Sequence, residues 1–161
     1  MQTPRVIASH EQSSRGYRFT DVPRETLEMN MPKVRVLVAD DFDTVRKGVC
    51  AILSSREGIE VCAEAANGEE AVRKARELKP DVVIMDFSMP VMDGLEASKK
   101  ILQAFPGMAI LMFSMHKTEA LTQAAKNAGV SGFVTKGESA QNLLQAVDSV
   151  MRKVPFFELE S

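Results

Sequence analysis

The sequence predicts an α/β fold in which five parallel strands form a doubly wound sheet. Five short apolar runs recur along the 161-residue chain, and stretches with helical spacing lie between them. Near-continuous apolar strands are typical of a parallel sheet covered on both faces, and right-handed crossovers place helices on those faces. Polar residues directly follow four of the runs. The pattern therefore also predicts functional side chains at the strand ends.

The predicted strands are short and rich in Val, Ile, Leu and Met. They cover residues 34–38, 59–65, 82–85, 108–113 and 132–135. Their length and composition favour buried strands over helices. The order of the strands in the sheet does not follow from this pattern.

Helical patterns fill the gaps between the strands. An apolar stripe over residues 45–53 predicts the first helix, with Asp43 as its N-cap. Asn67-Gly68-Glu69-Glu70 resembles a capping box at the start of the second helix, which Pro80 ends. The remaining helices are expected from Asp93 to just before Pro106, from Thr118 to Ala128, and from Glu138 to about Lys153.

The composition indicates one soluble domain and excludes several classes of protein. Hydrophobic residues make up 45% of the chain, charged residues 26%, and the net charge of −2 provides no basic field for nucleic acid or anionic lipid. No apolar run approaches the roughly 20 residues that span a bilayer, and the first residues lack a signal-peptide core. Cys50 and Cys62 read as free core residues, with a single bridge as the minor alternative. We therefore expect a cytoplasmic protein without membrane contact.

The chain divides into three segments. Residues 1–31 show no sustained periodicity and are interpreted as a disordered arm, or as an extension upstream of a start at Met31. Residues 32–154 form the predicted domain, and residues 155–161 form a short C-terminal tail. Within this tail, Pro155-Phe156-Phe157 either packs back on the core or forms an exposed docking motif.

Five polar residues stand at predicted strand ends, namely Asp40, Asp41, Asp86, Ser114 and Lys136. The carboxyl ends of parallel strands share one edge, where open α/β sheets bind ligands. Crowded carboxylates raise each other's pKa values, and a divalent cation with oxygen ligands such as Mg²⁺ relieves this repulsion. An Asp carboxylate can attack phosphorus, a lysine can hold a phosphoryl oxygen and a serine can hydrogen-bond another.

Each residue also has a structural interpretation when it is taken alone. Asp40-Asp41 can form a turn and a helix cap, and Asp86 can be an ordinary loop residue. Ser114 can cap the next helix, and Lys136 can be a solvated surface lysine. Because all of them follow strands in one register, the sequence favours a phosphoacceptor site at which Asp86 is the nucleophile.

These motifs resemble the receiver domain of bacterial two-component signalling over about residues 33–153. Residues 36–41 (VLVADD) are similar to its first strand and acidic pair. Residues 83–94 (VIMDFSMPVMDG) are similar to its phosphoacceptor strand and loop, and this is the most specific match. Ser114 and Lys136 match the Ser/Thr and Lys positions of the family.

The resemblance implies a flavodoxin-like sheet of order 2-1-3-4-5 and a set of roles. Asp86 would accept a phosphoryl group from a phosphohistidine on a sensor histidine kinase or a histidine phosphotransfer protein. Asp41, Asp86 and the backbone carbonyl of Ser88 would hold Mg²⁺, with Asp40 acting through water. Such a domain is not an enzyme beyond its own phosphorylation and dephosphorylation.

The chain departs from the family pattern in three ways. Phe133 stands at the switch position where the family often has Tyr. Gly137 follows Lys136 where Pro is common, and a cis non-proline bond costs about 2.5–4 kcal/mol, so we expect a trans peptide. The sequence resembles receivers that usually carry a helix-turn-helix domain, but only residues 154–161 follow the last predicted helix. We therefore expect a stand-alone response regulator without direct DNA binding.

Two further expectations concern tuning and output. Ser88 and His116 lie two residues after Asp86 and Ser114, at positions that tune loss of the phosphoryl group in the family. His116 is equally well explained as a plain exposed histidine. By analogy, the surface from residue 118 through Lys136 to the last helix contacts a downstream protein partner.

Two other classes of function remain as alternatives. One is a constitutive interaction module that is never phosphorylated, against which the intact carboxylate cluster argues. The other is an enzyme, either an aspartyl-phosphate phosphatase or a flavin carrier. Ser88 stands where such a phosphatase has its second Asp, and the loop at residues 40–43 (DDFD) would repel a flavin phosphate.

Overall fold

The sheet is parallel throughout and follows the order β2-β1-β3-β4-β5-β6. A computed structural model describes residues 32–157, so the predictions for residues 1–31 and 158–161 lie outside it. The strands are β1 (Val34–Ala39), β2 (Ile59–Ala65), β3 (Val82–Asp86), β4 (Ala109–Ser114), β5 (Gly132–Thr135) and β6 (Phe156–Phe157). The first five confirm the predicted strands and the expected order.

The sixth strand corrects the prediction of a five-stranded sheet. Phe156 and Phe157 pair in parallel with Gly132 and Phe133 of β5, within the segment that the sequence assigns to a tail. Both aromatic residues are half-buried against the core, so the interpretation that they pack back on the domain is confirmed. The physical reason is that β5 would otherwise leave its backbone N–H and C=O groups unpaired at the sheet edge.

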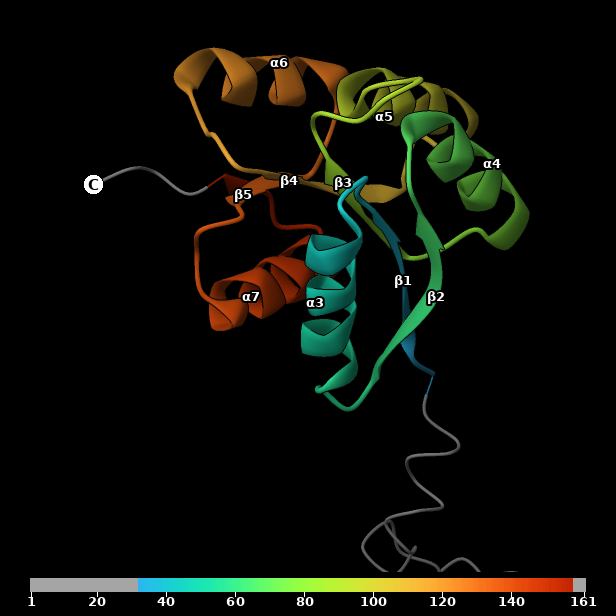
Figure 1. Cartoon of the computed structure of the whole chain (residues 1–161), viewed down its shortest axis with the longest axis vertical. Helices are drawn as coiled ribbons and strands as arrows, with labels where there is room; N and C mark the ends of the chain where they lie inside the picture. The colour runs from blue at the N-terminus through green and yellow to red at the C-terminus, as the bar shows by residue number, and fades with distance from the viewer. Residues whose placement is uncertain (1–31, 158–161) are drawn as a thin grey trace, which may run out of the picture. The chain divides into compact units, whose positions relative to one another are not determined.

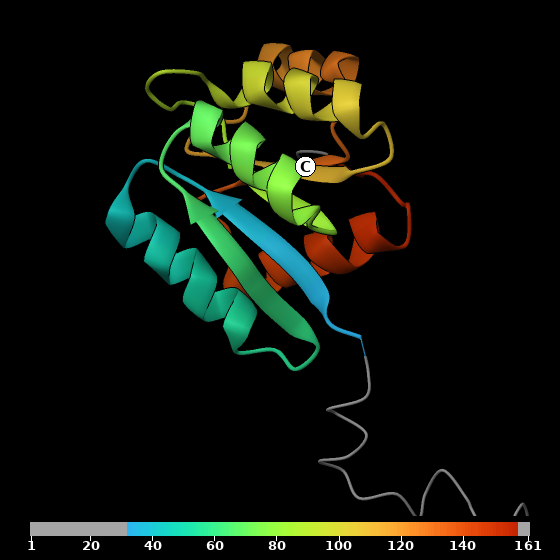
Figure 2. The same cartoon turned by 90° about the vertical axis from the view of Figure 1, so that its right-hand side faces the viewer.

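Within residues 32–157, five helices cover the two faces of the sheet (Figures 1 and 2). They are α3 (Asp43–Ser54), α4 (Gly68–Leu78), α5 (Gly94–Ala104), α6 (Glu119–Ala128) and α7 (Ala140–Met151). Helices α3 and α7 cover one face, and α4, α5 and α6 cover the other. Two apolar clusters, one on each face, therefore bury the central strands β3 and β4 at every residue, as their near-continuous apolar sequences predict.

Most helix ends lie where the sequence places them. Asn67 accepts the N–H of Glu70 at 2.8 Å, Asp93 and Thr118 cap α5 and α6, and Gly129 closes α6 with φ = 92°. Asp43 does not cap α3. It is the first helical residue, and the N-cap position belongs to Phe42, whose side chain makes no cap hydrogen bond.

A tight loop between β3 and α5 holds β3 against the next helix. The N–H of Gly94 donates to the carbonyl of Phe87 at 2.8 Å. A Cβ atom at Gly94 would overlap the carbonyl oxygen of Asp86, so the close approach of this loop requires glycine. The Asp-Gly pair at residues 93–94 thereby fixes the backbone that carries Asp86.

Gly94→Ala is expected to lower the free energy of unfolding by about 2–3 kcal/mol, because the loop or the end of β3 must move to admit the methyl group. Gly48→Ala is the matched control, since a Cβ at this helical position meets nothing within 4 Å. The control should be stabilised by about 0.5–1 kcal/mol. Urea titrations measure both, and equal stability of the two variants would contradict the argument.

No helix among the described residues is long and apolar enough to cross a membrane. Cys50 and Cys62 are both free and half-buried, as expected. Burial raises the pKa of each thiol, which keeps both protonated near neutral pH.

Candidate phosphoacceptor and metal site

The carboxyl ends of β1, β3, β4 and β5 bring the predicted residues to one edge of the sheet. Asp86 is the last residue of β3 and lies in register with Phe113, one residue before Ser114. Ser114 ends β4 in register with Thr135, and the N–H of Lys136 donates to the Ser114 carbonyl at 2.8 Å. Topology therefore unites residues that lie up to a hundred positions apart in the sequence.

Three carboxylates form the acidic part of this site. Asp40 and Asp86 are buried and Asp41 is exposed, and one oxygen of each lies within 4.8 Å of the others. The pKa of Asp86 is raised to about 6, first by burial and then by the neighbouring Asp40 carboxylate, while Lys136 opposes the rise. The cluster thus carries the repulsion that the sequence predicts.

Lys136 partly neutralises the cluster from within. Its ammonium lies 2.7 Å from Asp40 Oδ2 and 3.2 Å from Asp86 Oδ1, and its side chain is only 6% exposed. The interpretation of Lys136 as a solvated surface lysine is therefore wrong. A buried lysine between two carboxylates can form an ion pair with an oxygen of a phosphoryl group at Asp86.

The donor set fits Mg²⁺. All three side chains offer hard oxygen ligands, and one oxygen of each lies within 4.8 Å of the others, so a single cation or its bound water could reach all three. Asp40 Oδ2 is buried and makes no hydrogen bond within the described residues, although it is ion-paired with Lys136. An oxygen in this position has a lone pair available for a cation or its water.

Asp40 also forms a turn, which was the structural interpretation of the Asp40-Asp41 pair. Its Oδ1 accepts the N–H of Phe42 at 2.9 Å, which forms the turn that enters α3. The turn and the site are therefore compatible. The corresponding alternative for Ser114 is wrong, because α6 begins at Glu119 and Thr118 is its cap. Ser114 is buried at the site edge, and its Oγ accepts the N–H of His116 at 3.4 Å.

The remaining predicted positions surround the site at different depths. Ser88 and His116 are exposed, on the loops that follow β3 and β4. Phe133 is fully buried in β5, and the Lys117 ammonium lies 5.9 Å from the centre of its ring. The peptide between Lys136 and Gly137 is trans, as expected, and no bond is cis within residues 32–157.

Arg46 on α3 supports the acidic loop and was not singled out from the sequence. Its guanidinium donates to the Asp40 carbonyl at 2.8 Å, to Glu64 at 2.8 Å and to Asp43 at 2.6 Å. The hydrogen bond with Glu64 raises the pKa of Arg46, so the side chain stays charged. A signal was present in the sequence, since Asp43 and Arg46 stand at i and i+3 on the predicted helix.

Arg46→Met is expected to weaken Mg²⁺ binding by about tenfold, because residues that hold metal ligands in position commonly contribute that much to metal affinity. It should also lower the free energy of unfolding by about 1–3 kcal/mol, since three charge-assisted contacts are lost. Arg73→Met is the control, because Arg73 makes only surface ion pairs with Glu70 and Glu77. Titration calorimetry with Mg²⁺ measures the difference, and equal affinities would refute a positioning role.

Comparison with known proteins identifies the family. Residues 36–148 match the model of the response regulator receiver domain. The transcriptional regulatory protein LnrK of Bacillus subtilis is 41% identical over 117 residues, which is 73% of this chain and 53% of LnrK. This chain therefore belongs to the response regulator receiver family, and it spans about half the length of the curated relatives it matches.

Solved structures agree with the assignment. A two-component response regulator of the LuxR family from Aurantimonas superimposes with a TM-score of 0.75 at 37% identity, over 77% of this chain and 89% of that one. The CheY of Borrelia burgdorferi, solved in a complex with CheX, BeF3 and Mg²⁺, gives a TM-score of 0.71 at 31% identity, over 77% and 92% of the two chains.

Proposed function

We propose that this receiver accepts a phosphoryl group on Asp86 from a phosphohistidine donor in a Mg²⁺-dependent reaction. The observation that carries the proposal is the contact of Lys136 with both Asp40 and Asp86 inside a three-carboxylate cluster. Repulsion within such a cluster lowers the free energy of unfolding. A sheet edge with a purely structural role would not need these carboxylates. The Borrelia relative solved with Mg²⁺ and BeF3 supports the same chemistry.

The residues divide the reaction between them. A carboxylate oxygen of Asp86 attacks phosphorus, the phosphorus–nitrogen bond to the donor histidine breaks, and the leaving imidazole keeps the electron pair and takes up a proton. With a pKa of about 6, Asp86 is mostly ionised at pH 7 to 8 and therefore competent as nucleophile. Lys136 and Ser114 are placed to hold phosphoryl oxygens.

Asp41, Asp86 and the backbone carbonyl of Ser88 would hold the metal, with Asp40 acting through water. When bound, Mg²⁺ supplies positive charge that offsets the repulsion between the carboxylates and the phosphoryl oxygens. The same groups allow the domain to catalyse its own phosphorylation and hydrolysis, without turnover of another substrate.

The experiment that tests the proposal is intact mass spectrometry after treatment with acetyl phosphate, with and without Mg²⁺. A single phosphoryl adduct is expected that requires both Mg²⁺ and Asp86, and Asp86→Ala should show none. Persistence of the adduct in Asp86→Ala would sink the assignment of Asp86. Absence of an adduct in the wild type from both acetyl phosphate and phosphorylated kinases would favour the constitutive interaction module.

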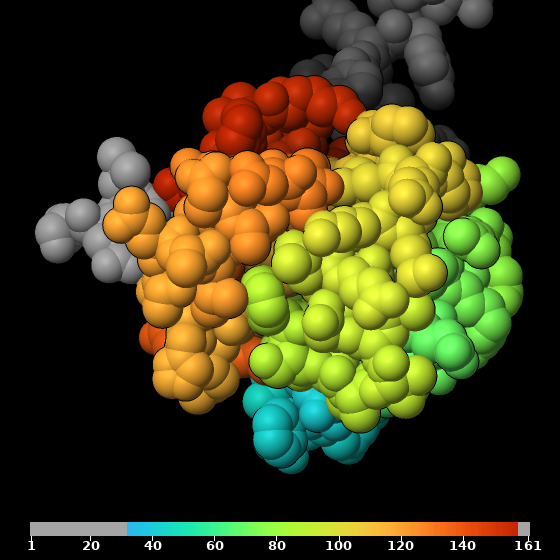
Figure 3. All heavy atoms as spheres, turned by 90° about the horizontal axis from the view of Figure 1, so that it is seen from above, coloured from blue at the N-terminus to red at the C-terminus, as the bar shows by residue number. Residues whose placement is uncertain are grey.

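An apolar rim, defined as Phe42, Val91 and Met115, is proposed as the docking surface for the phosphodonor. These side chains are 65%, 75% and 67% exposed, on the loops that follow β1, β3 and β4. Figure 3 shows these three segments side by side at one side of the molecule (cyan, yellow-green and light orange). Exposed apolar groups around a reactive site favour a protein partner.

Phe42→Ser is expected to slow transfer from a histidine kinase by about tenfold, since a central aromatic contact of an interface is often worth more than about 1 kcal/mol. The kinase is the one that phosphorylates the wild type fastest in a panel of purified kinases. Labelling by acetyl phosphate should stay unchanged. Val154→Ser is the control, because Val154 is 50% exposed outside these loops. Equal transfer to both variants would contradict the rim.

We further propose that the signal leaves through protein contact on the surface from Thr118 to α7. The net charge of −2 favours protein partners over direct contact with DNA. One matched relative, LnrK, is named a transcriptional regulatory protein, so DNA binding is the alternative to be measured. Gel-shift titration of the phosphorylated and unphosphorylated chain with mixed genomic fragments is expected to show no retardation, and saturable retardation would overturn this part of the proposal.

A further inference from the structure

The outer edge of β5 is covered by a strand of only two residues. Phe156 and Phe157 lie in register with Gly132 and Phe133, and the N–H of Phe156 donates to the Ser131 carbonyl at 2.9 Å. A strand this short contributes few hydrogen bonds, so its removal would expose backbone donors and acceptors along β5. Such an edge accepts an added strand from another protein.

The two phenylalanines occupy apolar sites on opposite faces of the sheet. Phe156 packs with the core cluster on the side of α3 and α7, and Phe157 packs with the cluster on the side of α4, α5 and α6. Gly132 allows the close approach, because a Cβ atom there would lie 2.6 Å from the Phe156 carbonyl oxygen. The edge is thus shaped for two consecutive apolar side chains.

Basic charge lies beside the second of these sites. The Lys126 ammonium on α6 stands 5.0 Å from the centre of the Phe157 ring. An ammonium this close to an aromatic ring makes a cation–π contact, so an aromatic residue is favoured at the second site. This contact therefore favours an occupant with an apolar residue followed by an aromatic one.

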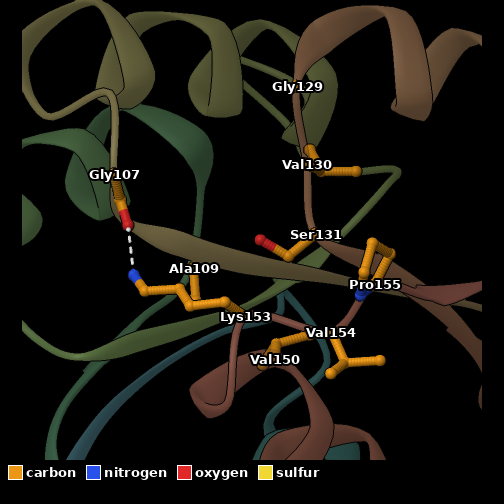
Figure 4. A pocket seen from close by; sticks show the side chains of 9 residues that line it. All are labelled: Gly107, Ala109, Gly129, Val130, Ser131, Val150, Lys153, Val154 and Pro155. Carbon is orange, nitrogen blue, oxygen red and sulfur yellow. Dashed lines mark hydrogen bonds between the residues drawn. The ribbon is translucent and has the colours of Figure 1, made fainter.

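The connection that brings the strand to the edge, residues 152–155, is exposed. Val154 exchanges two hydrogen bonds with Ser149, one of 3.0 Å from its N–H and one of 2.8 Å to its carbonyl. Lys153 adopts φ = 65°, a left-handed conformation that lysine rarely takes. Residues 153–155 line a pocket of about 260 Å³ together with Gly107 and Ser131, and Figure 4 shows the side chains that line it. Segments with few buried contacts open locally before the rest of a protein unfolds.

We propose that the outer edge of β5 is a docking site for an extended segment of a partner protein. This segment carries two consecutive apolar residues, the second of them aromatic. The chain's own Phe156–Phe157 strand occupies the site at rest, and the partner's segment replaces it. The site lies directly beside Phe133, so an occupant would contact the strand that leads to Lys136. The proposal stands independently of phosphorylation at Asp86.

The test uses a labelled peptide with the sequence of residues 153–161 (KVPFFELES) as the probe. The full chain carrying Phe156→Ser and Phe157→Ser has a vacated edge and is expected to bind the peptide saturably, at least tenfold more tightly than the wild type, whose own strand competes. A peptide with both phenylalanines replaced by serine should not bind. The absence of saturable binding, or equal binding to both chains, would overturn the proposal.

A second substitution locates the bound peptide. Gly132→Ala, added to the vacated chain, should weaken binding at least tenfold, because the new methyl group meets the carbonyl of the incoming strand. Gly137→Ala is the matched control, since a Cβ there meets nothing within 4 Å. Equal weakening by both changes would show that the peptide binds elsewhere.

The wild-type chain provides a measurement that does not depend on the stability of these variants. In native-state hydrogen exchange, the Phe156 amide is expected to exchange at least tenfold faster than the amides of β4. Exchange of Phe156 only by global unfolding would mean a permanent structural cover and would overturn the proposal. Light scattering that detects a strand-exchanged dimer would make a second copy the occupant, and would equally overturn a partner's segment.

Discussion

Lys136→Met destabilises the protein by about 2–4 kcal/mol at pH 8 without Mg²⁺, because removal of one partner leaves buried charges uncompensated. The Lys136 side chain is 6% exposed and lies within 3.2 Å of carboxylate oxygens of both Asp40 and Asp86. The loss should shrink at pH 5, since an unpaired Asp86, whose pKa is already raised, takes up a proton. Urea titrations at the two pH values measure the change in the free energy of unfolding.

Lys100→Met is the control for this result. Lys100 is exposed on α5, so its replacement should change stability by no more than about 0.5 kcal/mol. The unfolding free energies of the two variants should therefore differ at pH 8 and converge toward pH 5. A loss in Lys136→Met that is small, or equal at both pH values, would contradict the buried ion pairs. Whatever the size of its stability loss, Lys136→Met should also lose most of its labelling by acetyl phosphate.

Asp86→Asn raises the free energy of unfolding by about 1–2 kcal/mol at pH 8 without Mg²⁺, since it removes a charge that the folded state disfavours. The pKa of Asp86 is about 6 in the folded protein against an ordinary value of 3.8. A raised carboxyl pKa means that the folded state binds the proton more tightly. The contribution of Asp86 to stability is therefore full below pH 3.8 and is lost as the pH rises through 6.

The wild type and Asp86→Asn should accordingly have equal stability near pH 4 and diverge as the pH rises to 7. Added Mg²⁺ should stabilise the wild type more than the variant, because a ligand that binds only the folded state adds stability that increases with the logarithm of its affinity. Asp148→Asn is the control, since Asp148 makes an exposed ion pair with Arg56. A parallel pH dependence of the wild type and Asp86→Asn would refute the raised pKa.

The predicted elements follow from patterns that are local in the sequence. Apolar runs of four to seven residues indicate the first five strands, and capping residues such as Asn67, Asp93 and Thr118 indicate where helices begin. A capping residue needs only neighbours within one turn, so the sequence contains the information. Asp43 is the exception. Its carboxylate accepts a hydrogen bond from Arg46, and Asp40 forms the turn that enters α3.

The members of the site follow from topology as much as from residue type. In a parallel sheet every strand runs in the same direction, so the residues that follow β1, β3, β4 and β5 meet at one edge. Their proximity can therefore be predicted without any measured distance. Asp40, Asp86, Ser114 and Lys136 are found together for this reason. Which carboxylates Lys136 pairs with, and which of them are buried, depends on side-chain positions that no local pattern contains.

The sequence by itself determined the alternation of strands and helices and the residues at the strand ends, because both rest on periodicity and chain direction. Only the tertiary structure decided that Lys136 lies between Asp40 and Asp86, that Arg46 holds the Asp40 backbone, and that Phe156–Phe157 pairs with β5. These are long-range contacts. Their free energy comes from burial and charge pairing between distant segments, and it exists only once the sheet has brought those segments together.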